Sequence, residues 1–254
     1  MRFEKLTIKE LKAFLEHTGE LSPEQESLLK SDDRRGAAEL YKRYCRKKEA
    51  RTREEKRLNE MLSEEVLLIN KGFKAVAGVD EAGRGPLAGP VIAAAVILKP
   101  GVLINSLNDS KQLSAQTREY LFEQVILNAF SYGIAGATRE EIDQLNIHAA
   151  SMLAMQRALE RLSLEPDYVL VDGFKIRDCL FRQKAIKGGD GLSMSIAAAS
   201  ILAKVSRDKI MNDLHQKYPR YGFDRNKGYG TAAHREAIAR YGLCPAHRRT
   251  FKMA

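Results

Sequence analysis

Beyond residue 73, short apolar runs alternate with longer segments of mixed polarity. The runs with the length and β-branched content of strands are 74–79, 91–98, 131–137, 168–171 and 182–186. The segments that predict helices are 114–128, 139–162 with a break near Asn146, 193–217 and 231–241. Three strands come first and helices separate the later two, so the pattern predicts an α/β domain with a mixed sheet of roughly five strands flanked by helices.

Residues 1–70 differ from this pattern because they are highly charged and predict helices throughout. Ser22 followed by Pro23 is typical of a helix start, with the serine as N-cap. From Tyr41 to Arg57 the chain carries nine basic residues and three glutamates. Such a run is typical of a solvated helix face, and contact with nucleic acid is the alternative. We therefore expect a helical N-terminal extension over 1–70 and an α/β domain over 71–254.

The charge is unevenly distributed along the 254 residues. Lys and Arg number 42 against 33 acidic residues, a net charge of +9. Residues 1–70 hold 16 basic and 15 acidic groups, 71–172 hold 9 and 12, and 173–254 hold 17 and 6. An acidic centre followed by a basic C-terminal third fits a protein that binds a polyanion such as nucleic acid.

Cysteine usage and hydropathy indicate the compartment. Cys45, Cys179 and Cys244 are odd in number and far apart, which predicts neither a disulfide framework nor a zinc site. The N-terminus is charged, and the longest apolar run, 91–98, is less than half a membrane span. We expect a cytoplasmic protein without a membrane-spanning segment.

Two adjacent acids, Asp80 and Glu81, follow the first strand and precede a glycine-rich turn. Because side chains alternate along a strand, we expect these two to converge only if the strand ends between them. Unpaired acids at the end of a sheet are costly, and a divalent cation is the usual compensation. A solvated turn is the alternative for such a pair. The spacing of Gly83, Gly85 and Gly89 excludes a dinucleotide-binding fingerprint.

Two further acids lie beside predicted elements later in the chain. Asp172 ends the strand at 168–171, and side chains that carry chemistry collect where strands of an α/β sheet end. Asp190 precedes the helix at 193–217, where its spacing alone favours a role in helix-start electrostatics. An all-carboxylate set suits Mg²⁺ or Mn²⁺ rather than zinc or a redox metal. Two such ions can bracket a scissile phosphate.

The eleven residues from Asp80 to Pro90, DEAGRGPLAGP, resemble the opening motif of bacterial ribonuclease HII, the type 2 ribonuclease H that nicks DNA at embedded ribonucleotides. The resemblance spans about 73–252 and does not cover 1–70. Arg84 and Pro86 favour type HII over its paralogue HIII, in which both are replaced. The resemblance implies a ribonuclease H-like fold.

The resemblance also implies roles for particular residues. The catalytic and metal-binding carboxylates would be Asp80, Glu81, Asp172 and Asp190. Asp208 competes for the fourth position, and since only one of the two can reach the metals we choose Asp190. The substrate-binding residues would be the Gly83-Arg84-Gly85 turn and Tyr229, which together read the ribonucleotide–deoxyribonucleotide junction, and Lys111, which would contact a phosphate.

The activity that the resemblance implies is metal-dependent hydrolysis of the RNA strand of RNA–DNA hybrids. It would also nick duplex DNA 5′ of single ribonucleotides, leaving 3′-hydroxyl and 5′-phosphate ends, in ribonucleotide removal during replication and repair. The partners would be these nucleic acids, and the protein a monomer. The alternatives are a non-catalytic nucleic-acid-binding protein and a resolvase- or transposase-like DNA nuclease. The four acids argue against the first, and the turn with Tyr229 argues against the second.

Overall fold

The computed structural model describes residues 3–252 and divides into two compact units, one ending at Arg57 and the other beginning at Leu58. The division falls within one long helix, α3 (Arg35–Met61). Leu58 and Met61, at the end of that helix, pack with the core of the second unit. The domain boundary that the sequence places at residue 70 stays a prediction.

The first unit is helical. Its elements are η1 (Phe3–Lys5), α1 (Ile8–His17), α2 (Pro23–Lys30) and most of α3. Leu11, Leu29 and Ala37 are among the residues that form its small core. Ser22 is the N-cap of α2, as predicted, and Gln25 returns its hydrogen bond in a capping box.

The second unit contains the sheet. Its strands are β1 (Val76–Ala82), β2 (Val91–Leu98), β3 (Ala129–Ala137), β4 (Tyr168–Asp172) and β5 (Arg182–Ile186). Its helices after the end of α3 are α4 (Ser63–Asn70), α5 (Ala115–Asn128), α6 (Arg139–Leu145), α7 (Ile147–Glu160), α8 (Met194–Lys217), α9 (Phe223–Asn226) and α10 (Ala232–Tyr241). Short 3₁₀ turns are η2 (Ser110–Gln112), η3 (Gly189–Gly191) and η4 (Pro219–Tyr221).

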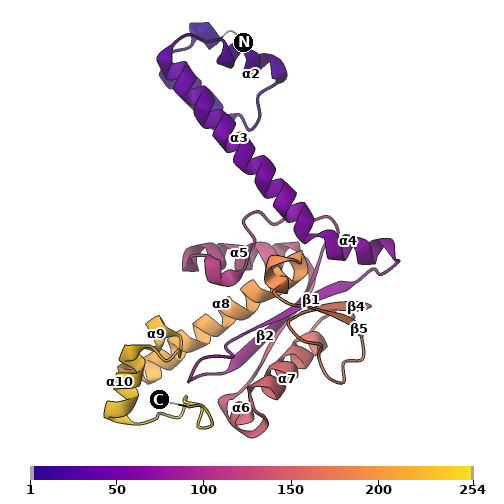
Figure 1. Ribbon diagram of the computed structural model, residues 1–254, viewed down its shortest axis with the longest axis vertical. Coiled ribbons are helices and arrows are strands. Elements are labelled where there is room, and N and C mark those ends of the chain that lie inside the picture. Colours follow the sequence, from indigo (N-terminus) through magenta and orange to yellow (C-terminus); the bar gives the residue numbers. More distant parts are fainter. Residues whose placement is uncertain (1–2, 253–254) are drawn as a thin grey trace. The chain divides into compact units, whose positions relative to one another are not determined.

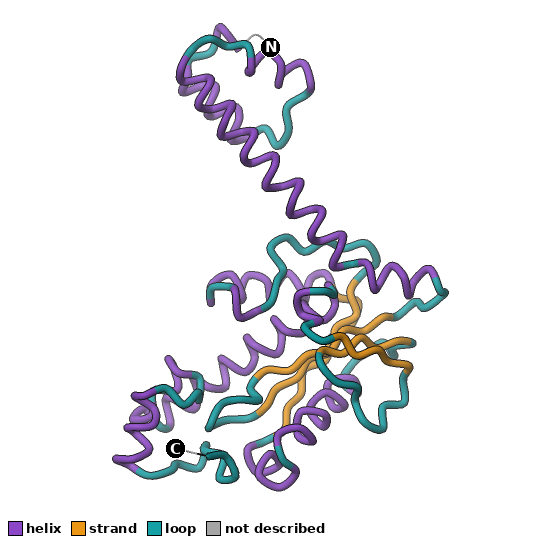
Figure 2. The backbone as a smooth tube through the Cα atoms, viewed as in Figure 1, coloured by secondary structure: helices purple, strands orange, loops and turns teal. Residues whose placement is uncertain are grey.

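The five strands form one mixed sheet in the order β3-β2-β1-β4-β5 (Figures 1 and 2). β2 runs antiparallel to β1 and β3, whereas β4 runs parallel to β1 and β5. The predicted mixed α/β architecture is confirmed. Because β1 and β4 are parallel neighbours, their carboxyl ends lie at the same edge of the sheet.

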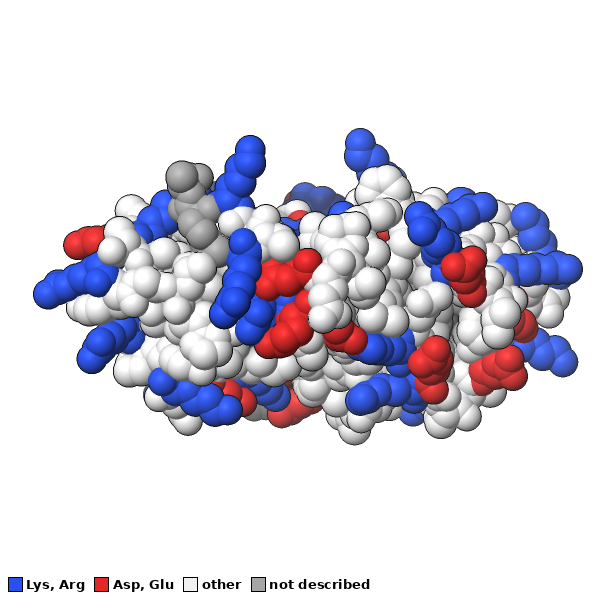
Figure 3. Space-filling view, turned by 90° about the horizontal axis from the view of Figure 1, so that it is seen from below, with Lys and Arg blue, Asp and Glu red and all other residues white. Residues whose placement is uncertain are grey.

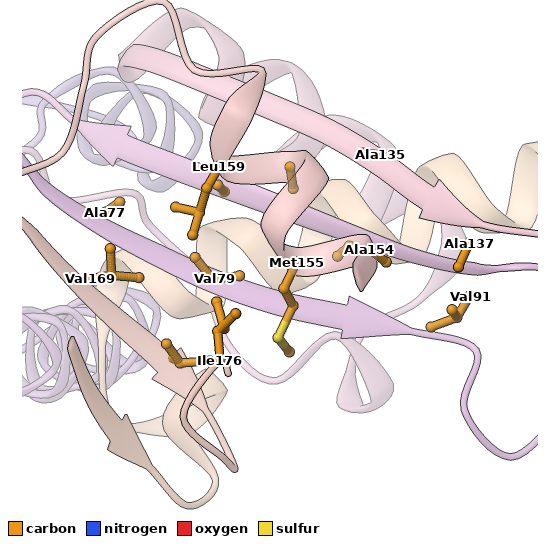
Figure 4. Packing of buried hydrophobic residues seen from close by; sticks show 14 of the residues in the cluster. Ala77, Val79, Val91, Ala135, Ala137, Ala154, Met155, Leu159, Val169 and Ile176 are labelled. Atoms are coloured by element: carbon orange, nitrogen blue, oxygen red, sulfur yellow. The ribbon is translucent and has the colours of Figure 1, made fainter. Parts of the chain in front are cut away.

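Helices cover both faces of the sheet. Ala77 and Val79 of β1 belong to the core cluster on the face packed against α7, where Met155 is one of the helix residues (Figure 4). Gly78 points to the other face, where a side chain would overlap the backbone of Ser195 in α8. This glycine therefore lets α8 lie close to the central strand, which brings the helix to the edge where the acids lie.

The predicted break in the helix at 139–162 is confirmed. Asn146 has φ 72° and separates α6 from α7, and its side chain accepts hydrogen bonds from the backbone of the first turn of α7. Thr138 and Glu141 form a capping box at the start of α6. Within residues 3–252, no helix is both long and apolar enough to cross a membrane.

Basic side chains outnumber acidic ones on the face of the molecule shown in Figure 3. That face is the one seen from below Figure 1, where α10 and the C-terminal segment lie. Both α10 and the C-terminal segment belong to the strongly basic last third of the sequence. A surface of this sign attracts the phosphate backbone of a nucleic acid.

Candidate active site

Asp80 and Glu81 both lie within β1, which continues to Ala82. The expectation that the strand must end between them is therefore wrong. Both nevertheless line one pocket of about 290 Å³. Pairing with β4 ends at Val79, so the sheet continues beside Asp80 and Glu81 only through β2, and side chains from opposite faces of the strand can reach the same pocket there.

Asp172 and Asp190 come to the same edge from later parts of the chain. β4 pairs with β1 so that Val171 lies beside Val79, which makes Asp172 the neighbour of Asp80. The backbone N–H of Gly189 donates to Asp172 Oδ1 at 2.7 Å, and this bond ties η3 to the end of β4. Asp190 is the next residue and is buried.

The predicted carboxylates repel one another in a desolvated environment. Burial, with the charges of Glu81 and Asp172, raises the pKa of Asp80 well above its usual value, and the residue is only 5% exposed. Burial also raises the pKa of Glu81, although Arg84 Nη1 lies 3.2 Å from Glu81 Oε1 and opposes the shift. Such a site favours any cation that can balance the charges.

Asp190 shares this electrostatic environment. Burial and the nearby Asp109 raise the pKa of Asp190, while Lys111 opposes the shift from 3.7 Å. The pKa of Lys111 itself is raised, because the surrounding carboxylates, Asp190 and Asp109 foremost, outweigh the effect of its own burial. Lys111 therefore stays charged beside the acids.

The donor chemistry fits Mg²⁺ or Mn²⁺, since every predicted ligand offers oxygen and the carboxylate charges are poorly compensated. Across residues 3–252, however, no three acidic, histidine or cysteine side chains stand in an arrangement that would hold a metal ion. Ligation by Asp80, Glu81, Asp172 and Asp190 would therefore require some of these side chains to rotate from the positions seen here.

The pocket gathers all but one of the residues that the sequence singled out. Its lining comprises Asp80, Glu81, Ala82, Gly83, Arg84, Gly85, Ser110, Lys111, Asp172, Ser200, Lys204, Arg207 and Tyr229. Asp190 does not line it and reaches it through its contact with Lys111. Tyr229 is 47% exposed, so its ring is available to a ligand.

Asp208, the competing acid, lies on α8 and has other partners. Its carboxylate is 2.6 Å from Lys204 Nζ and 3.7 Å from Arg118 Nη2. Lys204 lines the pocket, whereas Asp208 does not. In this arrangement Asp208 balances the charge of two cations.

Several residues at the site could not be identified from the sequence. Ser200 of α8 lowers the pKa of Asp80 and so opposes the effect of burial, and its hydroxyl lies 3.1 Å from that of Ser110. Arg207 is 1% exposed and donates to the backbone carbonyls of Ala88, Pro90 and Lys227. Burial lowers the pKa of Arg207 to about 10, well above neutral pH, so this buried guanidinium stays charged.

Alanine at the two glycines of the Gly83-Arg84-Gly85 turn should have different effects. Gly83 has φ 102°, and a Cβ there would overlap the Arg207 guanidinium, so Gly83→Ala should lower both thermal stability and activity. A Cβ at Gly85 would lie 3.6 Å from Tyr229 Cε1, an ordinary contact, so Gly85→Ala should leave the melting temperature unchanged. Melting curves of the two variants test this, and equal destabilisation would contradict it.

Comparison with known proteins agrees with this architecture. Residues 77–254 match the family Ribonuclease HII, and residues 7–68 match the family Ribonuclease HII N-terminal domain. The chain is 46% identical over 249 residues to Ribonuclease HII of Pelotomaculum thermopropionicum, covering 97% of this chain and 94% of that protein. It is 54% identical over 185 residues to Ribonuclease HII of Syntrophotalea carbinolica, covering 73% and 88%.

A solved structure shows the same fold. The crystal structure of ribonuclease H2 from Pyrococcus horikoshii aligns with a TM-score of 0.61 at 29% identity, covering 71% of this chain and 95% of that one. The match to the family covers more than half of the chain, and the Pelotomaculum protein is matched over nearly its whole length. The chain therefore belongs to the ribonuclease HII family of type 2 ribonucleases H.

Proposed function

We propose that this ribonuclease H nicks duplex DNA on the 5′ side of single embedded ribonucleotides, as well as cutting the RNA strand of RNA–DNA hybrids, and that it depends on two Mg²⁺ or Mn²⁺ ions. The observation that supports this most strongly is the placement of Asp80 and Asp172. They lie next to each other on neighbouring parallel strands, where the pairing of β1 with β4 ends, and they share a pocket with the glycine turn and with Tyr229. Cleaving groups and recognition groups thus line the same pocket.

Asp80, Glu81, Asp172 and Asp190 would hold the metal ions. When bound, such ions activate water for attack on the phosphate and stabilise the leaving 3′-oxygen. Lys111, charged and exposed at the rim, would contact a phosphate of the cut strand. These residues bind and orient the backbone without reading a base.

Recognition of RNA at one nucleotide requires a contact to the 2′-hydroxyl, the group that distinguishes it from DNA. The Gly83-Arg84-Gly85 turn offers backbone amides and carbonyls at short range in the pocket. The Tyr229 ring beside Gly85 offers a flat surface for the sugar or base at the junction. We assign these elements to the ribonucleotide and the adjoining deoxyribonucleotide.

A labelled duplex with one ribonucleotide tests the proposal. We expect a single cut on its 5′ side, giving a 3′-hydroxyl and a 5′-phosphate, because the attacking group is water. The matched all-DNA duplex should stay intact. A 2′,3′-cyclic phosphate product would show that the 2′-hydroxyl is the nucleophile and would contradict the mechanism. Cutting of the all-DNA duplex at a similar rate would instead favour a resolvase-like nuclease.

The remaining assignments follow from the same function. The partners would be RNA–DNA hybrids and ribonucleotide-containing duplex DNA, bound by a monomer. We place this activity in the cytoplasm, where the three cysteines, which are free in the structure, would remain reduced.

The first unit offers a second surface for the substrate. Lys42, Arg46 and Arg53 of α3 are exposed and lie on one stripe of the helix, since they are four and seven residues apart. Neighbouring cations are already paired with acids, as Lys48 is with Glu26 at 2.6 Å. We propose that the stripe contacts backbone phosphates.

Neutralising this stripe should weaken binding without affecting chemistry. The triple variant Lys42→Gln, Arg46→Gln, Arg53→Gln should lower substrate affinity and flatten its salt dependence by about 0.9 in the log–log slope for each lost contact. The turnover rate of the bound substrate should not change. Lys48→Gln is the matched control. An unchanged slope in the triple variant would mean that the stripe is only a solvated helix face.

A further inference from the structure

The backbone carbonyl of Tyr229 is held by a chain of hydrogen bonds through two buried histidines. His234 Nδ1 lies 2.9 Å from this carbonyl oxygen, and the Nε2 atoms of His234 and His247 are 3.0 Å apart. At the far end, the backbone N–H of Cys244 lies 2.9 Å from His247 Nδ1. Both rings are almost fully buried, against Tyr221 and Phe223.

The two ends of this chain fix the tautomer of each ring. The Cys244 N–H can only donate, so His247 Nδ1 accepts and neutral His247 carries its hydrogen on Nε2. That hydrogen points at His234 Nε2, which must accept, and the hydrogen of His234 therefore sits on Nδ1, facing the Tyr229 carbonyl. Every donor then meets an acceptor.

The reverse assignment fails at one end. His247 could instead donate from Nδ1 to the Cys244 carbonyl, which is farther away at 3.3 Å. His234 would then have to donate from Nε2, and its Nδ1 lone pair would face the Tyr229 carbonyl oxygen. A buried contact between two acceptors is costly, so the first assignment is favoured.

Arg248, the next residue after His247, holds the other recognition element. It is completely buried, and it donates to the carbonyls of Gly83, Arg84, Gly89 and Pro90. Within the described chain, no carboxylate is paired with its guanidinium. Burial and the nearby Arg207 lower the pKa of Arg248 to about 9, which leaves it charged near neutral pH.

This contact sets the direction of the amides in the turn. In a trans peptide the N–H points opposite to the carbonyl of the same plane. Since the carbonyls of Gly83 and Arg84 point to Arg248, the N–H groups of Arg84 and Gly85 point away from it. In the described structure neither N–H has a protein partner, so both remain available to a ligand in the pocket that the turn lines.

We propose that His247 and Arg248 are positioning residues that hold the two recognition elements in place. His247, through His234, fixes the backbone of Tyr229. Arg248 fixes the direction of the amides in the Gly83-Arg84-Gly85 turn. The proposal deepens the proposed function and rests on the recognition role given there to Tyr229 and the turn. It explains why a segment far from the carboxylates in sequence matters to the pocket, which both the turn and Tyr229 line.

Nitrogen chemical shifts of the histidine rings test the first arm independently of activity. In the full-length protein at neutral pH, we expect His247 to carry its hydrogen on Nε2 and His234 to carry its hydrogen on Nδ1. Opposite tautomers in neighbouring rings would not arise from packing alone. The same tautomer in both rings, or a charged ring, would overturn the proposal that His247 positions Tyr229 through His234.

A double-mutant cycle tests whether His234 acts through Tyr229. His234→Phe removes the donor, and we expect kcat/KM on the single-ribonucleotide duplex to fall about tenfold, mainly through KM. His234→Asn keeps a donor near the Nδ1 position and should recover most of that loss. In a Tyr229→Ala background, His234→Phe should cost little more, because the two effects are coupled.

The outcomes separate this proposal from the proposed function. Unchanged cleavage by Tyr229→Ala would refute the role that the proposed function gives to Tyr229. The opposite tautomers of His234 and His247 would still be expected, because they depend only on the hydrogen bonds between the rings and the backbone. If Tyr229→Ala is impaired but His234→Phe costs the same in both backgrounds, the positioning role is overturned. Failure of the Asn variant to recover activity, with a normal melting temperature, would also overturn it.

Arg248 is tested against its neighbour Arg249, whose side chain is exposed. Arg248→Lys keeps the charge but loses the planar fork that reaches several carbonyls, so we expect KM for the single-ribonucleotide duplex to rise about tenfold or more. Arg249→Lys should leave KM within about twofold of the wild-type value. A native melting temperature together with a wild-type KM in Arg248→Lys would contradict the positioning role of Arg248. So would a lowered melting temperature together with a wild-type KM, measured at a temperature where the variant is folded.

Discussion

Asp80→Asn should reduce cleavage of a single-ribonucleotide duplex by more than about 100-fold, because residues that merely support metal ligands already cost ~10–100-fold when lost. Asp80 is 5% exposed, and the charges of Glu81 and Asp172 act on its carboxylate. The amide keeps the size of the side chain and can still accept the hydrogen bond that Asp80 Oδ1 receives from the backbone N–H of Glu81 at 2.7 Å. Single-turnover rates at saturating enzyme measure the effect, and near-normal activity would contradict the metal-site assignment.

Thermal melting in EDTA provides the control for this variant. The pKa of Asp80 in the folded protein is raised above its unfolded value, so its contribution to stability is fully present below the unfolded pKa and is lost as pH rises through the folded pKa. Near neutral pH Asp80 therefore contributes less to the stability of the metal-free fold than it does at acidic pH. Asp80→Asn should melt at a higher temperature than the wild type there, with a smaller difference at acidic pH. A lower melting temperature would mean that activity was lost through misfolding.

Asp190→Asn should lose most of the activity and Asp208→Asn little. Asp190 is buried next to Gly189, which is hydrogen-bonded to Asp172, and it contacts Lys111. Asp208 instead forms ion pairs with Lys204 and Arg118. As a matched pair of amide substitutions, the two variants differ only in which carboxylate is removed.

Cleavage rates at several Mn²⁺ concentrations measure this difference. A higher Mn²⁺ requirement in Asp190→Asn alone would assign the loss to metal binding. If Asp208→Asn is the inactive variant and Asp190→Asn cleaves normally, Asp208 is the fourth carboxylate and our choice is wrong.

The fold followed closely from the sequence because its signals are local. β-branched runs predict the strands, and Ser22 followed by Pro23 predicts the start of α2 where the structure has it. The sequence predicts that the first strand ends at residue 79, whereas β1 continues to Ala82. The prediction stops short because Asp and Glu are rare in strands. Tertiary pairing with β2, in which Asp80 lies opposite Ala94, overrides that local preference.

The supporting residues of the site could not be found in the same way. Arg207 and Arg248 bind backbone carbonyls. Every residue has a carbonyl, so the sequence does not indicate which ones an arginine will bind. The pairing of His234 with His247 depends on how α10 and the C-terminal segment fold back together. The nine residues assigned to the site were found because they belong to motifs, whereas Arg207 and Arg248 reach the segment around the glycine turn from more than 100 positions away along the chain.

Cleavage of a single-ribonucleotide duplex by metal-stripped protein tests the central claim most directly. After EDTA treatment we expect no cut, and added Mn²⁺ or Mg²⁺ should restore a cut 5′ of the ribonucleotide in the wild type but not in Asp80→Asn or Asp172→Asn. Cleavage at an undiminished rate in excess EDTA, or equal restoration in the two variants, would show that these carboxylates do not hold the catalytic metal ions.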